Sequence, residues 1–269
     1  MPFAIAPDGA RLFYEATSLV PPWRNEAGVV LMHHGVGLTG DAWMDWQPTL
    51  LAADYRVIRI DLRGFGRSEV PAEGYKWSLP NFFSDMNAVL AAESVDKFHF
   101  VGESIGGMIG LAYAARHPER VLSGAVLSTP FDGGRIRAVE RWRTTVAARG
   151  MVGWADEMMP MRFVESDVDP SIQEWVRNLQ AHCSATVVCE QGDFIRTQDL
   201  TPELGQIKAP ILILAPDGSP FVDRSMPTDL HALIATSELQ WFPSQRHSLL
   251  MSRAHECAAA YLAFLQRRT

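Results

Sequence analysis

The chain has 269 residues, of which 47% are hydrophobic and 20% charged, with a net charge of −7 and a pI near 5.6. These values predict one large packed domain, or a domain carrying an insertion, and they argue against a disordered chain. The acidic balance also argues against a nucleic-acid partner or an anionic membrane surface, because both favour a basic protein face.

The N-terminus and the cysteines set the expected compartment. The first residues, MPFAIAPDGARLFYE, lack the positive start and apolar core of a signal peptide, and apolar runs such as PILILAP are too short to cross a bilayer. Cys183, Cys189 and Cys257 are an odd number without close spacing, and neither CxxC nor HExxH occurs. We therefore expect a soluble cytoplasmic protein with no disulfide, no metal and no cofactor. A homodimer is an open alternative for its assembly.

Short apolar runs alternate with helical patterns along the chain. The runs predict strands at residues 28–35, 55–64, 97–104, 121–130, 210–216 and 238–243. Runs nearly continuous in Val, Ile and Leu are typical of strands buried on both faces of a mainly parallel sheet. The intervening patterns predict helices around Phe82–Leu90, at 105–118 and at 252–268. This alternation predicts an α/β fold.

The alternation breaks once, between residues 131 and 208. This segment is helical in pattern, rich in Trp, Met and Arg, and has no obvious strand. We interpret it as a helical cap inserted into a core that consists of residues 1–130 and 209–269.

The segment KFHFVGESIGGMIG places Ser104 between Gly102 and Gly106, at the end of one predicted strand and the start of a predicted helix. This is the setting of a nucleophile elbow, in which a strained turn exposes the serine and glycines avoid backbone collisions. An ordinary glycine-rich turn is the alternative. Serine is a weak nucleophile, so the interpretation requires a base and an oxyanion site elsewhere.

Two further segments supply these groups. His247, in WFPSQRHSLL, follows the last predicted strand and precedes the last helix, which makes it the candidate base. The loop in MHHGVG follows the first strong strand, and the N–H of Val36 together with that of Ile105 would form the oxyanion hole. His33 and His34 precede Val36 and are suited to bracing this loop.

In this order the motifs HHGVG, DLRGFGRS and GESIGG and the late histidine resemble the α/β-hydrolase superfamily. The segment ARHPERV and the cap around RWRTTVAARGMVGWADEMMPMRF are most similar to 3-oxoadipate enol-lactonases and related small-ester hydrolases. The resemblance implies a mostly parallel central sheet with helices on both faces and an inserted helical cap. It also implies a serine hydrolase that cleaves a small ester or lactone through an acyl-enzyme, without a cofactor.

The third member of the triad departs from the family pattern. In LILAPDGSPFVD, alignment on the proline places Ser219 where the family has its acid. Asp217 lies two residues upstream and is the first candidate acid, because alternate strand residues point to the same side. Asp132, after the preceding strand, is the alternative, and the remaining possibilities are Asp223 or no acid at all. The mismatch also leaves open a non-hydrolytic member of the fold, either a C–C lyase or hydrolase or a ligand-binding protein.

The cap and the first loop supply the candidate substrate-binding residues. Trp142 stands where the lactonase-like cap carries a tryptophan, and Trp154 and His34 are further candidates. Five arginines could supply a clamp for an acidic lactone, although a solvated helix face is the simpler interpretation: Arg135, Arg137, Arg141, Arg143 and Arg162.

Overall fold

The computed structural model describes residues 3–268 and contains a single eight-stranded sheet. The strands lie in the order β1-β2-β4-β3-β5-β6-β7-β8. Their bounds are β1 Phe3–Ile5, β2 Arg11–Thr17, β3 Gly28–His33, β4 Tyr55–Ile60, β5 Phe98–Glu103, β6 Val121–Leu127, β7 Ile211–Pro216 and β8 Ser237–Phe242. β1 and β2 are antiparallel to their neighbours, whereas β4, β3, β5, β6, β7 and β8 are mutually parallel.

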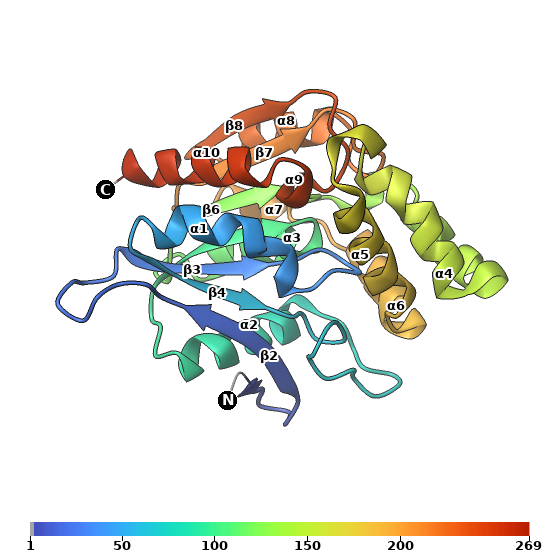
Figure 1. Ribbon diagram of the computed structural model, residues 1–269, viewed down its shortest axis with the longest axis horizontal. Coiled ribbons are helices and arrows are strands. Elements are labelled where there is room, and N and C mark those ends of the chain that lie inside the picture. The colour runs from blue at the N-terminus through green and yellow to red at the C-terminus, as the bar shows by residue number, and fades with distance from the viewer. Residues whose placement is uncertain (1–2, 269) are drawn as a thin grey trace.

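Helices cover both faces of the sheet (Figure 1). The face bearing α2 (Leu79–Ala92), α3 (Ile105–Arg116) and α8 (Ser225–Leu233) has a core that includes Phe82, Met108 and Leu230. The opposite face packs the short helix η1 (Gly40–Trp46), α1 (Gln47–Leu51), α9 (Leu249–Ser252) and α10 (Ala254–Gln266) around Trp46 and Tyr261. Strands buried on both faces explain the nearly continuous apolar runs of the sequence.

Between β6 and β7 the chain forms helices instead of strands. The three longest are α4 (Trp142–Arg162), α5 (Pro170–Ala181) and α6 (Ala185–Arg196), and they gather beyond the ends of the parallel strands (Figure 1). Gly150 has a non-helical backbone conformation, with φ of 64° and ψ of −173°, and this kink divides α4 into two parts. The short helices η2 (Gly133–Arg135), η3 (Val139–Arg141), η4 (Glu165–Asp167) and α7 (Thr201–Leu204) complete the connection. The division into core and cap at residues 131 and 208 remains an interpretation of this arrangement.

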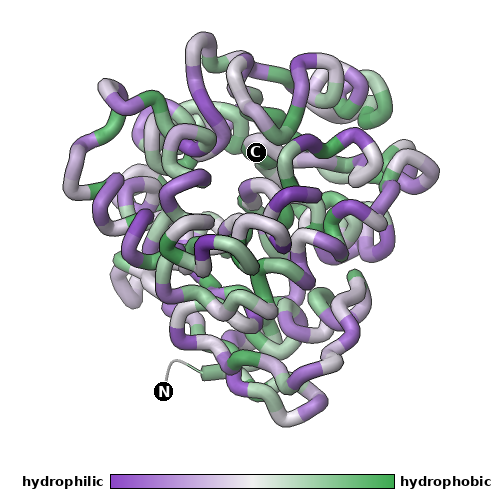
Figure 2. Tube along the Cα trace, turned by 90° about the vertical axis from the view of Figure 1, so that its right-hand side faces the viewer, coloured by the Kyte–Doolittle hydropathy of each residue, from purple (hydrophilic) through white to green (hydrophobic). Residues whose placement is uncertain are grey.

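Figure 2 looks onto this side of the molecule and shows hydrophilic and hydrophobic positions alternating along the outer helices. In α5, for example, Val176 and Gln180 are buried while most other positions are at least partly exposed. Such helices pack through one stripe of side chains. Within residues 3–268, no helix combines the length and apolar character needed to cross a membrane.

The predicted α/β architecture is confirmed, and each of the six predicted strands is present. The sequence interpretation missed the first two strands. They form a hairpin whose turn contains Asp8 and Gly9, and Gly9 has a φ of 89°, a value that glycine adopts readily.

Candidate active site

Ser104 occupies a strained turn between β5 and α3. Its φ of 55° and ψ of −120° lie outside the regions that most residues adopt. A Cβ at position 102 would lie 2.5 Å from the backbone of Gly106, and a Cβ at position 106 would lie 2.4 Å from the carbonyl oxygen of His33. Only glycine therefore fits at both positions, and the turn has the geometry of a nucleophile elbow.

Two backbone N–H groups near Ser104 have no hydrogen-bond partner among the described residues 3–268. The N–H groups of Val36 and Ile105 donate none of the turn, loop and capping hydrogen bonds between backbone groups in residues 3–268. Ile105 begins α3, where the first N–H groups of a helix have no partner within the helix. Both remain available to bind an oxyanion, as the sequence predicts.

Ser104, Val36 and His247 line one cavity beneath α4 and α6. The wall is mostly apolar and includes Ile136, Val139, Trp142, Met158, Phe221 and Val222. The cavity is narrow, with a volume of about 30 Å³, roughly enough for two waters. The geometry brings the predicted nucleophile and the predicted base together in one narrow, largely apolar space.

His247 is 5% exposed, and the structure holds it from several sides. Its N–H donates to the carbonyl of Met161 at 3.3 Å, and its own carbonyl accepts from the Ser128 hydroxyl. The ring packs edge-on against Phe221. Burial and, secondarily, the charge of Arg162 lower the pKa of His247 to about 3, so the ring is neutral at pH 7. Within the described residues no hydrogen bond joins Ser104 to His247, and in serine hydrolases this bond often tightens only when substrate binds.

The partner of His247 Nδ1 is Ser219, whose Oγ lies 3.1 Å away. The same Oγ accepts the N–H groups of Phe221 and Val222, each at 3.3 Å. These two bonds engage the lone pairs of the oxygen and leave the hydroxyl proton to point at Nδ1. The arrangement favours the tautomer that carries its proton on Nε2. Ser219 therefore stands at the acid position, as its alignment indicated.

The three candidate acids make other contacts in the structure, and among the described residues none of them has a hydrogen bond to the ring of His247. Asp217 accepts the N–H of Ser244 at 2.6 Å, because the carboxylate turns toward the loop that follows β8. Asp132 accepts the N–H of Gly134 and thereby caps η2. Asp223 likewise caps the turn before α8 and pairs with arginine side chains.

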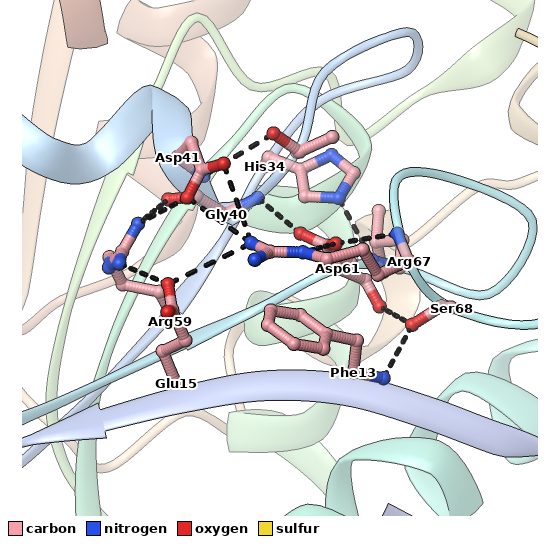
Figure 3. Close-up of polar contacts among 11 residues, drawn as sticks. Phe13, Glu15, His34, Gly40, Asp41, Arg59, Asp61, Arg67 and Ser68 are labelled. Atoms are coloured by element: carbon pink, nitrogen blue, oxygen red, sulfur yellow. Dashed lines mark hydrogen bonds and ion pairs between the residues drawn. The ribbon is translucent and has the colours of Figure 1, made fainter. Parts of the chain in front are cut away.

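His34 lies in a bracing network and not in the cavity wall, which corrects its assignment as a substrate-binding residue. Its Nε2 accepts the N–H of Leu62 at 2.9 Å, and its Nδ1 lies 2.8 Å from the carbonyl of Gly35. Figure 3 shows the surrounding contacts, in which Asp61 accepts the N–H groups of Gly40 and Arg67. Burial lowers the pKa of His34. The two loops that follow β3 and β4 are thus tied together.

The two cap tryptophans have different positions. Trp142 lines the cavity, as predicted, whereas Trp154 is fully buried behind it, with the ring centroids 5.4 Å apart. Of the five cap arginines, only Arg162 lines the cavity. Arg135, Arg137 and Arg143 form ion pairs at the surface, and Arg141 and Glu157 are a looser pair.

Sequence reasoning missed Glu103, which directly precedes Ser104. Its side chain is fully buried, and neither carboxylate oxygen accepts a hydrogen bond of ordinary geometry within the described residues. Burial raises the pKa of Glu103 to about 7, while the charge of Arg162, the Ser248 hydroxyl and the Gly35 N–H act in the opposite direction. A charged residue in the middle of GESIGG, after an apolar strand, was the available signal.

Comparisons with known proteins agree with the fold. A family model described as alpha/beta hydrolase fold matches residues 28–157. A non-heme haloperoxidase of Rhodococcus erythropolis is 27% identical over 99% of this chain and 100% of its own length. The AB hydrolase superfamily protein YisY of Bacillus subtilis is 28% identical over 72% of this chain and 75% of its own. The crystal structure of an enol-lactonase from Burkholderia xenovorans superposes with a TM-score of 0.87 at 24% identity, covering 98% of this chain and 100% of that one.

Proposed function

We propose that this chain, whose residues 28–157 match a family model described as alpha/beta hydrolase fold, is a serine hydrolase that cleaves small esters or lactones through an acyl-enzyme. Ser104 is the nucleophile, His247 the base, and the N–H groups of Val36 and Ile105 bind the oxyanion. The observation that carries this proposal is the shared cavity of Ser104, Val36 and His247. The structural similarity to an enol-lactonase supports the substrate class.

The reaction follows from this arrangement. The Ser104 Oγ attacks the ester carbonyl while His247 Nε2 takes its proton, and the carbonyl oxygen becomes an anion held by the two N–H groups. When the tetrahedral intermediate collapses, His247 returns the proton to the leaving alkoxide. A water molecule then attacks the acyl-enzyme with His247 again as base, which releases the acid and restores Ser104.

The Ser219 contact sets the expected speed. For His247 to accept a proton at Nε2, Nδ1 must carry the other one, so the Ser219 hydroxyl has to rotate and accept from Nδ1 instead of donating to it. In a related serine protease, a change that reverses the histidine tautomer lowers kcat by about 10⁴. We therefore propose a slow hydrolase, whose residual catalysis depends on the oxyanion site and the cavity.

The same contact favours one second candidate function. A chain in which Ser219 holds His247 in the unproductive tautomer would bind a small ligand, or cleave a C–C bond, without turning over esters. The narrow apolar cavity suits such a ligand as well as it suits an ester.

Turnover of p-nitrophenyl acetate and of a panel of small lactones tests the proposal. Wild type should show slow release of p-nitrophenol, which Ser104→Ala abolishes and Ser166→Ala, at an exposed position, leaves unchanged. A serine-directed sulfonyl fluoride should add one label to wild type and none to Ser104→Ala. Failure of wild type to hydrolyse any ester, thioester or lactone would favour the second candidate.

A further inference from the structure

Arg162, the last residue of α4, reaches from the cap into the active site. Its side chain is 6% exposed and lines the cavity beside Ser104 and His247. Nη2 donates to the carbonyl of Val36 at 2.5 Å, and Nη1 donates to the Ser248 Oγ at 3.1 Å. One guanidinium therefore contacts both the residue that offers an oxyanion N–H and the residue that follows the base.

The backbone strengthens this junction. The carbonyl of Met161 accepts the N–H of His247, and the carbonyl of Arg162 accepts the N–H of Ser248 at 3.1 Å. The end of α4 is thus joined to the histidine loop by two backbone bonds and one side-chain bond. The bond from the Arg162 side chain to the carbonyl of Val36 joins the same helix end to the oxyanion loop.

The buried charge of Arg162 needs a compensating charge. No carboxylate of residues 3–268 forms a direct ion pair with it, and its Nε has no hydrogen-bond partner there. The charge that acts on it most is that of Glu103, whose buried carboxylate lies against Gly35, beside Val36 in the oxyanion loop. Removing Arg162 would leave the Glu103 carboxylate buried without a compensating charge, which is costly in an apolar interior.

We propose that Arg162 is a positioning residue that holds the oxyanion loop and the histidine loop in register, with buried Glu103 as its countercharge. This inference rests on the proposed function. No carboxylate contacts His247 Nδ1, yet the ring must become a cation in every turnover. The positive charge of Arg162 opposes that step, and the charge of ionised Glu103 acts on Arg162 in the compensating direction.

This proposal links activity to the ionisation of Glu103. Four other titratable groups lie around this junction: His33, His34 and His247 have pKa values lowered by burial, and burial raises the pKa of the Cys183 thiol to about 11. All four are neutral at pH 7, so Glu103 is the group at the junction that titrates near neutrality. The value of kcat should therefore rise with pH through about 7.

The test measures kcat and KM for p-nitrophenyl acetate between pH 5.5 and 9. Arg162→Lys keeps the charge but loses the forked geometry, and it should lower kcat by roughly 30-fold or more with KM within about threefold. Millimolar guanidinium should restore part of the activity of Arg162→Ala. Arg143→Lys, at a surface ion pair of the cap, is the matched control and should match wild type.

Glu103→Gln is isosteric and should abolish the rise of kcat near pH 7 while lowering kcat at pH 8 by about tenfold. Glu203→Gln, which disrupts an ion pair with Arg116 away from the cavity, should keep the wild-type profile. Ser248→Ala removes only a hydroxyl, so it should fold even where Arg162 variants do not. It should shift the rise of kcat to higher pH, because this hydroxyl favours the ionised form of Glu103.

The outcomes separate the two claims. If wild type shows no turnover that depends on Ser104, both the proposed function and this inference are wrong. An active wild type combined with unchanged kcat in Arg162→Lys and an unchanged pH profile in Glu103→Gln would overturn the inference alone.

Discussion

The Oγ of Ser219 lies 3.1 Å from Nδ1 of His247. This contact turns the role of the histidine into a question of proton placement. A hydroxyl can donate to the ring or accept from it, whereas an ionised carboxylate can only accept. The functional group that faces Nδ1 thus decides which nitrogen of His247 carries the proton.

Ser219→Asp should increase turnover. A carboxylate at this position would accept from Nδ1, place the lone pair on Nε2 and stabilise the imidazolium. We expect kcat for p-nitrophenyl acetate to rise by about 10- to 100-fold. Asp217→Asn and Asp132→Asn are the matched controls and should change kcat by less than about twofold, since neither carboxylate contacts the ring. A large loss in either control would show that an aspartate reaches His247 in solution.

Glu103→Gln should be more stable than wild type at alkaline pH although it is less active. Burial raises the pKa of this carboxyl from 4.5 to about 7. Between these values the folded chain binds the proton more tightly than the unfolded chain, so the free energy of unfolding falls as pH rises. The variant should gain about 3 kcal/mol at pH 8 and almost nothing at pH 4. Urea unfolding at the two pH values measures the difference, and equal gains at both would contradict this account.

Acid should destabilise the protein below about pH 6.5 because buried histidines are held neutral. Burial lowers the pKa of His33 and His247 to about 3 and that of His99 to about 4. Below pH 6.5 these histidines bind protons in the unfolded chain but stay neutral in the folded chain. The free energy of unfolding therefore falls by up to about 1.4 kcal/mol per pH unit for each histidine. Melting temperatures between pH 7 and pH 5 report this loss. His99→Gln should reduce the slope, whereas His255→Gln, at an exposed position, should leave it unchanged.

Ile136→Ala should shift the acyl-chain preference. Ile136 lines the cavity and is only partly buried, so its truncation widens the cavity without removing a central core residue. One or two methylene groups in an apolar pocket change selectivity by roughly 10- to 200-fold. The ratio of kcat/KM for p-nitrophenyl butyrate over acetate should therefore rise by about tenfold. Ile172→Ala, outside this cavity, should keep the wild-type ratio.

Gly106→Ala should abolish activity. The new methyl group would lie 2.4 Å from the carbonyl oxygen of His33, so β3 and the elbow would have to move apart. We expect kcat to fall by at least about 10²-fold, because the Ile105 N–H shifts with the elbow. Gly205→Ala has its nearest contact at 4.0 Å and is the control. Wild-type kcat in Gly106→Ala would show that the elbow tolerates a side chain.

Sequence patterns predicted the strands of the parallel sheet because each is a nearly continuous apolar run. The hairpin of β1 and β2 was missed because it lies at the edge of the sheet and mixes polar with apolar residues. Arg11 and Glu15 are at least partly exposed there, while Leu12 and Phe13 are buried. The signal that could have revealed it is the turn sequence Pro-Asp-Gly at residues 7–9.

The candidate site divides in the same way. Ser104 and His247 follow from local motifs at the ends of strands, and so does the unusual Ser219. The direction of Asp217 does not follow, because it depends on the N–H of Ser244 in a loop far along the chain. Glu103 and Arg162 are ordinary charged residues in the sequence, and only the folded chain shows that they share a buried junction.

The narrowness of the cavity ties chemistry to motion. A space for about two waters is smaller than an ester, so we expect α4 and α6 to move away from the sheet when substrate enters and product leaves. Solvent viscosity should then slow turnover even when the bond-breaking steps are fast. In variants that loosen the junction at Arg162, product release should be faster, but the reacting groups should be less well aligned.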